Sequence, residues 1–307
     1  MYPLNEFPTN GFVSLGRVAD PAACGKLLAD IERTREFSPA LFLSEADYRA
    51  NPQHKGVNPV PGRNLIERFD TSFIEQAPAF VAAMTAALGP GYRMLDKKFV
   101  VGVPESWMPP WLVKETHGLA VANLGAYVRP EYRDITYFHG IDFHQDIIDF
   151  KERRADFITA YVYLADTSES TSPLYVVPRS HAFGATTFPH RITYTPHGRR
   201  MRYEAPHGGA DDFDYLMLTG PAGSIYFWHS CTLHGTKPHM ADQPRISVRM
   251  LIESRDGGAT LLDRANRAIQ GPLSLVETRE DLDAAGRARI RGNTINVEDK
   301  RKDGSPA

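Results

Sequence analysis

From about residue 92 to residue 252, the chain is a series of short apolar or alternating segments separated by Gly, Pro and Asp. Short runs rich in Val, Ile, Tyr and Phe between such residues are typical of β-strands. Five segments have this pattern: residues 98–103, 157–164, 174–177, 224–228 and 246–252. No helix-length segment alternates with them, which favours an antiparallel sandwich or jelly roll over a parallel α/β sheet.

Two helices are predicted before this β region. Asp20 and Pro21 form a favourable N-cap and first turn, and apolar residues follow at helical spacing. Ser72 is expected to cap the second helix, with Glu75 completing a capping box and Gly89 ending the helix. Pro78 lies inside this span and indicates that the helix starts a turn later.

We therefore expect one domain over residues 1–307, with helices packed on an outer face of the β core. Its parts are an N-terminal helical flank (about 1–90), the β core (about 91–255) and a C-terminal helix with a polar tail (about 256–307). Residues 185–215 are interpreted as a long insertion-like loop, rich in His and Arg. Long loops of this kind are often lids or binding elements; an ordinary solvated loop is the alternative.

Composition narrows the class of protein. The net charge of −2 and the pI near 6.6 give no reason to expect nucleic acid or an anionic membrane as partner. The two cysteines, Cys24 and Cys231, fit no zinc or redox spacing. Without a signal peptide or a spanning segment of about 20 apolar residues, we expect a soluble, cytoplasmic protein. The oligomeric state is left open.

The tripeptide His144-Gln145-Asp146 places an imidazole and a carboxylate two positions apart. Within a strand, residues i and i+2 point to the same side of the sheet. Two imidazoles and one carboxylate can occupy one face of an iron(II) ion and leave the other face open. With 11 histidines and 37 acidic residues among 307, about one such pair is expected by chance, so a surface His–Asp pair is the alternative interpretation.

A second histidine ligand is sought in residues 223–236, where a strand runs into a turn and ends in His234-Gly235-Thr236. His234 is the candidate. Its rivals are His229, which closes the strand, and His239, which lies in the polar loop that follows.

An arginine precedes the last strand. Arg245 is a candidate anion-binding group, because a buried arginine is costly without an anion and its fork fits a carboxylate. Arg249 competes for this role, since both arginines lie on one face of the strand.

Together, these features resemble the phytanoyl-CoA dioxygenase family of iron(II)- and 2-oxoglutarate-dependent oxygenases over residues 11–255. The resemblance rests on residues 10–13, 144–146, 175–181 and 223–236 and on the distance from His234 to Arg245. It implies a mainly β fold with flanking helices around a double-stranded β-helix core, also described as a cupin-like jelly roll.

The resemblance also implies roles for individual residues. The iron(II) ligands would be His144, Asp146 and His234, and Arg245 would bind the distal carboxylate of the co-substrate 2-oxoglutarate. Gln145 and Thr236 match positions that contact the co-substrate in some members, and Lys98 and Tyr161 lie on strands that would line the same pocket. The implied reaction uses O2 to hydroxylate an unactivated C–H bond of a small molecule, releasing succinate and CO2.

Two departures from the family pattern bear on the substrate. Arg179 stands where the family's Pro-Gly-Ser-His motif has glycine, and His239 stands where many members have asparagine. The candidate substrate contacts are Arg179, Asp142 and Trp111. The basic residues of 190–207 are consistent with an anionic small molecule.

Halogenation is not expected, because members that halogenate have a small residue in place of Asp146. Two other classes remain open. One is a non-catalytic β-barrel binding protein. The other is a zinc-dependent hydrolase that uses His144, Asp146 and His234 around an activated water.

Overall fold

A computed structural model describes residues 2–194, 199–255 and 258–290. Within these ranges the main sheet has ten strands in the order β1-β11-β5-β13-β2-β4-β12-β6-β10, with β3 paired to β4. Only β2 and β4 pair in parallel; all other neighbours in this sheet are antiparallel. The strands are β1 (Phe12–Arg17), β2 (Arg93–Gly102), β3 (Val121–Asn123), β4 (Thr136–His144), β5 (Phe157–Tyr163), β6 (Leu174–Val176), β10 (Leu216–Leu218), β11 (Ser224–His229), β12 (His234–Thr236) and β13 (Arg245–Glu253).

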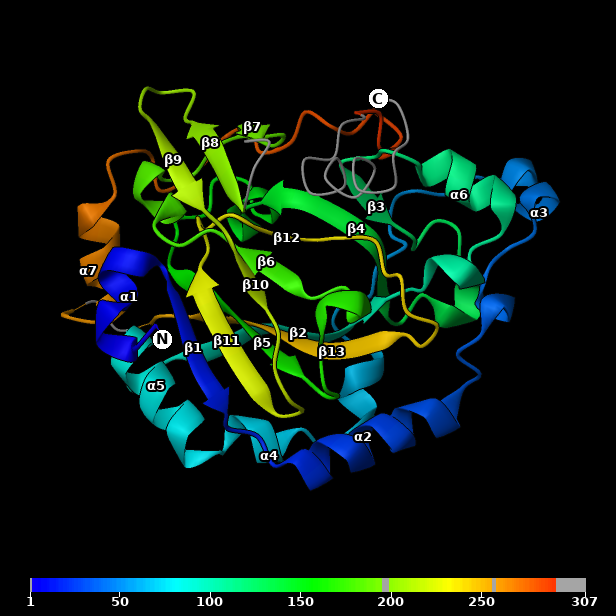
Figure 1. The fold of residues 1–307 in the computed structure, drawn as a ribbon, viewed down its shortest axis with the longest axis horizontal. Coiled ribbons are helices and arrows are strands. Elements are labelled where there is room, and N and C mark those ends of the chain that lie inside the picture. Colours follow the sequence, from blue (N-terminus) through cyan, green and yellow to red (C-terminus); the bar gives the residue numbers. More distant parts are fainter. Residues whose placement is uncertain (1, 195–198, 256–257, 291–307) are drawn as a thin grey trace.

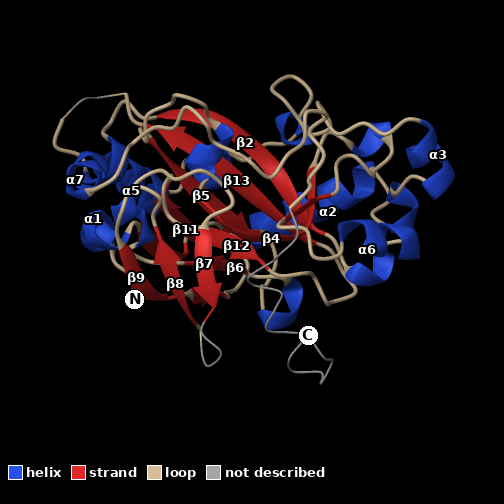
Figure 2. Ribbon diagram, turned by 90° about the horizontal axis from the view of Figure 1, so that it is seen from above, coloured by secondary structure: helices blue, strands red, loops and turns tan. Residues whose placement is uncertain are grey.

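Helices flank this sheet, and α2, α4 and α5 run along one side of it (Figure 1). The α-helices are α1 (Phe7–Asn10), α2 (Pro21–Thr34), α3 (Glu45–Ala50), α4 (Ser72–Glu75), α5 (Pro78–Leu88), α6 (Pro110–Thr116) and α7 (Leu261–Ala268). Viewed from above, α1, α5 and α7 gather at one end of the sheet, and α3 and α6 at the other (Figure 2). No helix in the described ranges is long and apolar enough to cross a membrane.

Three central strands sort their side chains between two faces, as the period of two requires. The outward positions pack into the same apolar core as α2 and α5: Ile246, Val248, Met250 and Ile252 of β13, Ile158, Ala160 and Val162 of β5, and Phe99 and Val101 of β2. The alternate positions face inward: Arg245, Ser247 and Arg249, then Thr159, Tyr161 and Tyr163, then Lys98, Val100 and Gly102. The apolar outer set thus fixes which polar side chains enter the interior.

The sheet curls back on itself. Trp228 of β11 and His234 of β12 are separated by four strands in the sheet order, yet their ring centroids are 4.7 Å apart. Such an approach requires the two ends of the sheet to face each other across an interior. The predicted mainly β, jelly-roll core is therefore confirmed.

The N-terminal flank follows the prediction in part. Helix α2 begins at Pro21, and Asp20 caps it by accepting a 2.7 Å hydrogen bond from the Ala22 amide. The second predicted helix is in fact two, because Pro78 occupies the first turn of α5 and separates it from α4. The flank also supplies a strand, since β1 pairs with β11 at the edge of the sheet.

The interpretation of residues 185–215 as a long loop is wrong for most of the described part. They contain β7 (Arg191–Tyr194), β8 (Arg200–Glu204) and β9 (Ala210–Asp214), which form a separate three-stranded antiparallel sheet. Met201 and Tyr203 are buried on one face, while the alternate residues of β8 are exposed. Residues 195–198 of the predicted loop lie outside the described ranges.

Candidate metal centre

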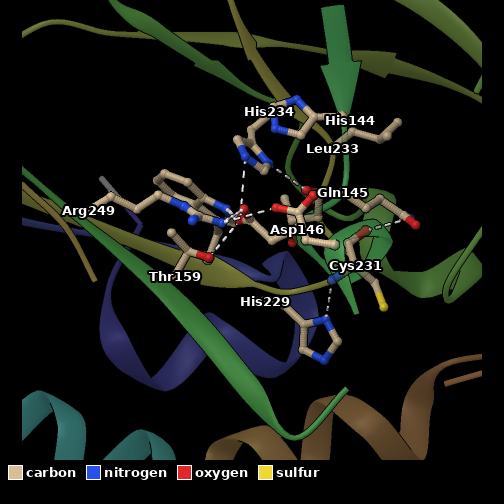
Figure 3. A network of polar contacts seen from close by, with 12 residues as sticks. His144, Gln145, Asp146, Thr159, His229, Cys231, Leu233, His234 and Arg249 are labelled. Carbon is tan, nitrogen blue, oxygen red and sulfur yellow. Dashed lines mark hydrogen bonds and ion pairs between the residues drawn. The ribbon is translucent and has the colours of Figure 1, made fainter. Parts of the chain in front are cut away.

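Three polar side chains meet inside the curled sheet (Figure 3). Ligating atoms of His144, Asp146 and His234 all lie within 4.8 Å of one another, and His234 Nε2 is 3.4 Å from an oxygen of Asp146. The two imidazoles come from opposed positions, because the antiparallel register of β12 and β4 pairs His234 with His144. Cross-strand partners of this kind have their Cβ atoms about 5 Å apart, a spacing that suits two ligands of one ion.

Asp146 reaches the site through a turn. Strand β4 ends at His144, and Asp146 begins the 3-10 turn η6 (Asp146–Asp149). The expectation that both residues point inward from one continuous strand is therefore wrong in detail.

The side chain of Gln145, between the two ligands, fixes this turn. Its Nε2 donates to the carbonyls of Gly184 and Cys231 at 2.8 Å each, and its Oε1 accepts from the Thr186 amide at 2.9 Å. Both the nitrogen and the oxygen of the side-chain amide hydrogen-bond to backbone groups, so Gln145 points away from the metal ligands.

Both histidine ligands present Nε2 to the site. His144 Nδ1 lies 3.0 Å from the Asp142 carbonyl, and His234 Nδ1 lies 3.1 Å from the Thr232 carbonyl. A carbonyl only accepts, so each Nδ1 carries the proton and each Nε2 keeps its lone pair. Burial lowers the pKa of both imidazoles, which favours the neutral form that binds a metal.

The carboxylate of Asp146 is held by three donors. The Thr159 hydroxyl donates to one oxygen at 2.6 Å and the Trp228 indole to the same oxygen at 3.0 Å. Arg249 forms an ion pair with the other oxygen. Burial alone would raise the pKa of Asp146, but the charge of Arg249, the neighbouring imidazoles and the hydrogen bond from Thr159 hold it well below the usual range.

The rival histidines make other contacts. His229 Nε2 lies 3.1 Å from the Asn266 side-chain oxygen, and its Nδ1 accepts a 3.1 Å hydrogen bond from the Cys231 amide. His239 Nδ1 accepts from the Ala241 amide at 3.2 Å. Both nitrogens of His229 are therefore used, and neither residue belongs to the group that could hold a metal.

A pocket that is partly open to solvent leads to the three ligands. Four further predicted residues line it: Lys98, Tyr161, Thr236 and Arg245. Arg249 and Asp149 line it as well, together with Val100, Phe138, Ile141, Leu174 and Trp228. The pocket thus has an apolar wall and several cations close to the metal centre.

Arg245 is a buried cation with no carboxylate partner among the described residues. Its side chain donates to the hydroxyls of Tyr161 and Ser247 at 3.3 Å each, and its Nε has no hydrogen-bond partner. The opposing residue on β2 is Gly102, where a Cβ atom would lie 3.4 Å from Arg245 Nη2. The absence of a side chain there leaves room for the guanidinium, which still lacks the anion that its burial demands.

Three predicted substrate residues do not line the pocket in the described structure. Arg179 has φ of +69°, and its guanidinium lies 5.7 Å from the ring centre of Phe213. Asp142 turns an oxygen back to the Phe143 amide at 2.9 Å, and Trp111 stacks on Tyr48 with ring centroids 5.3 Å apart. The left-handed backbone at Arg179 favours glycine, the residue that the family usually has there.

Sequence reasoning missed Thr159 and Trp228 as partners of Asp146, and it gave Arg249 a different role. A signal was present for Thr159 and Arg249. Both lie an even number of positions from an inward-facing residue, Tyr161 and Arg245 respectively. No spacing rule joins Trp228 to Asp146, since the sheet must curl before they meet.

The fold and the site define a jelly-roll protein with a centre of two histidines and one carboxylate. The same pocket holds an arginine that has no carboxylate partner in the described part of the chain. The comparison with known families agrees: residues 7–247 match the model of "Phytanoyl-CoA dioxygenase (PhyH)". The chain belongs to this family.

Individual relatives are distant. The chain is 25% identical over 203 residues to the "Ectoine dioxygenase" of Bordetella parapertussis, covering 58% of this chain and 64% of that protein, so it spans less than two thirds of that relative. It is 29% identical over 100 residues to a "Probable alpha-ketoglutarate-dependent hypophosphite dioxygenase" of Stutzerimonas stutzeri, covering 32% and 34%. Among solved structures, EvdO2 of Micromonospora carbonacea var. aurantiaca, complexed with 2-oxoglutarate, shares the fold with a TM-score of 0.50 at 17% identity, over 82% of this chain and 89% of that one.

Proposed function

We propose that this protein is an iron(II)- and 2-oxoglutarate-dependent dioxygenase that hydroxylates an unactivated C–H bond of a small molecule and releases succinate and CO2. Family membership and the three converging ligands support the class. One observation carries the proposal: Arg245 is buried in the same pocket as these ligands, and no carboxylate of the described residues balances its charge. A dicarboxylate chelated at the metal would supply that anion.

The residues present fit a ferrous ion. Two neutral imidazoles and one ionised carboxylate are the donor set of iron(II) oxygenases, which keep open coordination positions. The ligands are oriented by carbonyl, hydroxyl, indole and guanidinium partners, as metal ligands in proteins commonly are. When bound, the iron and 2-oxoglutarate supply oxidative decarboxylation coupled to C–H oxidation.

The chain's own residues bind and orient the reactants. Arg245 would form a bidentate pair with the distal carboxylate of 2-oxoglutarate, with the Tyr161 and Ser247 hydroxyls holding the guanidinium in place. Thr236 lines the same pocket and is proposed as a further co-substrate contact. No such contact is proposed for Gln145, because its amide is used by the backbone.

The apolar wall has a separate task. Val100, Phe138, Ile141 and Leu174 line the pocket next to the ligands. Apolar side chains at these positions exclude water from the reacting C–H bond and offer a surface for the hydrocarbon part of a substrate.

Loading the protein anaerobically with iron(II) and 2-oxoglutarate, then admitting O2, tests the proposal through succinate release. We expect release from the wild type, and loss of both succinate formation and hydroxylation in His144→Ala and Asp146→Ala. His207→Ala, an exposed histidine, is the control and should keep the activity. Full turnover in either ligand variant would refute the assignment.

The same experiment separates the two other classes. Succinate formation, even without hydroxylation, contradicts a purely binding role. A zinc hydrolase would work with zinc in the absence of O2 and 2-oxoglutarate, and would not need Arg245. Activity under those conditions would replace the oxygenase proposal.

An anionic small-molecule substrate and a cytoplasmic location complete the proposal. Arg249 and Lys98 line the pocket and favour an acidic ligand. Cys24 and Cys231 are free, buried thiols, which is compatible with a reducing compartment. Cell fractionation tests the location.

A further inference from the structure

Two cations face each other beside the metal centre. The register of β2 and β13 pairs Lys98 directly with Arg249, and both side chains line the pocket that leads to the ligands. Like charges at directly opposed positions of neighbouring strands destabilise a sheet. This pair therefore needs compensation from another charge.

The positive charge of Arg249 is balanced by nearby carboxylates of the protein, and the positive charge of Lys98 is balanced less well. Arg249 is paired with Asp146, and its Nη atoms lie 3.9 Å and 4.0 Å from oxygens of Asp149 and Asp96, beyond hydrogen-bond distance. The side-chain ammonium group of Lys98 makes no hydrogen bond and no ion pair with any described residue within 4.0 Å. A divalent cation on Asp146 would add further positive charge beside Arg249.

Lys98 still carries its charge at neutral pH. Burial, together with the neighbouring charge of Arg249, lowers its pKa to about 8, and the acidic residues oppose this shift only in part. The ammonium form remains the main one at pH 7, so the interior holds a cation without a direct partner.

This pair is separate from the site expected for the co-substrate. Arg245 opposes Gly102, whereas Arg249 opposes Lys98, four residues further along each strand. At about 3.4 Å per residue, the two positions are roughly 14 Å apart along the sheet. Asp146, one of the three metal ligands, contacts Arg249, so a co-substrate held by Arg245 approaches the metal from the other end.

We propose that Lys98 and Arg249 together bind an acidic group of the substrate, so that the substrate class is a small organic anion with an apolar body. The acidic group is a carboxylate, sulfonate or phosphate, which the paired cations recognise by charge-assisted hydrogen bonds. The body lies against Val100, Phe138 and Leu174. This inference rests on the proposed function, which makes this pocket the substrate site, and it assigns Lys98 to the substrate rather than to 2-oxoglutarate.

Calorimetric titration of the anaerobic iron(II)- and 2-oxoglutarate-loaded protein tests this site. The probes are 3-phenylpropionate and hexanoate, their neutral amides, and inorganic sulfate and phosphate. We expect the acids to bind at millimolar concentration or better, and the amides roughly tenfold or more weakly, because a charged hydrogen bond is lost.

Two variants assign the binding to the pocket. Lys98→Met removes the charge while keeping an unbranched side chain, and it should weaken acid binding about tenfold or more and leave 2-oxoglutarate affinity within about twofold. Asp149→Asn removes a half-exposed carboxylate from the same pocket, so acids should bind at least as tightly as to wild type. Urea unfolding confirms that both variants are folded.

Three results would overturn the inference: equal binding of acids and amides, no binding of any anion, or a Lys98→Met variant that loses 2-oxoglutarate affinity instead. Failure of the proposed function gives a different result, since iron(II) and 2-oxoglutarate would then not bind together. If the metal-free protein binds the acids and the Lys98→Met substitution abolishes this binding, the anion site would still be supported.

Discussion

Thr159 is expected to tune the metal centre without touching the metal. Its hydroxyl donates to the Asp146 carboxylate at 2.6 Å inside the protein. Thr159→Val keeps the shape and removes this donor, so we expect iron(II) affinity to fall about tenfold. Competition with a chelator measures the affinity.

Thr136→Val is the matched control. Thr136 is also a buried strand threonine, but its hydroxyl has no hydrogen-bond partner among the residues that the structure describes. Its replacement should leave iron(II) affinity unchanged. Equal iron(II) affinities for the Thr159→Val variant and the wild type would show that the Thr159 hydroxyl does not support Asp146.

The two arginines of β13 are expected to differ in function. Arg245→Lys loses the bidentate geometry, and the apparent Kd for 2-oxoglutarate should rise about tenfold or more. Arg249→Lys should change this Kd less, because Arg249 contacts Asp146. Titration of 2-oxoglutarate into the iron(II)-loaded variants measures both, and a reversed ranking would move the co-substrate role to Arg249.

At the residue level, the sequence predicted ligand types well and side-chain directions poorly. Residue type and spacing made His144, Asp146, His234 and Arg245 candidates, and the family resemblance selected them over their rivals. The structure brings them into one pocket. The direction of Gln145 depends on carbonyls at positions 184 and 231, which no local pattern reveals.

Among the elements, the turn after β4 gives a further prediction. Gln145→Leu removes three hydrogen bonds and leaves buried backbone groups of Gly184, Thr186 and Cys231 without partners. We expect the free energy of unfolding to fall by about 2–4 kcal/mol. Urea denaturation measures this loss.

The same variant tests the earlier expectation that Gln145 contacts the co-substrate. If its role is to hold the turn, a folded Gln145→Leu protein should bind 2-oxoglutarate nearly as well as wild type. Unchanged stability with a clear loss of 2-oxoglutarate affinity would favour the co-substrate contact instead.

Two strands that are buried on both faces, β5 and β13, were predictable, and the half-exposed strand β8 was not. Residues of β5 and β13 are almost all buried, so their apolar runs stand out. Strand β8 alternates buried Met201 and Tyr203 with exposed Arg200, Arg202 and Glu204, and its charges make it resemble a polar loop. Strand β1 is a short edge strand that only its partner β11 identifies.

At the scale of the whole molecule, the site exists because the sheet closes. β4, the turn that follows it and β12 provide the ligands, while β5, β11 and β13 provide Thr159, Trp228 and Arg249 from the other side of the interior. A sequence pattern predicts which face of a strand is inward. It does not predict which inward residues meet, because that depends on the order and curl of all the strands.

Closure of the sheet also buries histidines outside the metal centre. Their burial predicts how the free energy of unfolding changes with pH. His181, His229 and His239 are each at most 1% exposed. Burial lowers their pKa values from 6.5 to about 4, about 3 and about 4, respectively. Below pH 6.5 the unfolded chain therefore binds protons that the native protein does not.

Because the unfolded state binds more protons, the free energy of unfolding should fall as the pH drops from about 6.5 to 5, above the range where most carboxylates titrate. Each such histidine contributes a slope of up to about 1.4 kcal/mol per pH unit. Urea unfolding of the metal-free protein across this range measures the slope. His181→Gln does not titrate, and its amide can replace the Nε2 donor to the Pro8 carbonyl, so its slope should be shallower. A free energy of unfolding that stays constant or rises toward pH 5 would show that these imidazoles are not kept neutral by the fold.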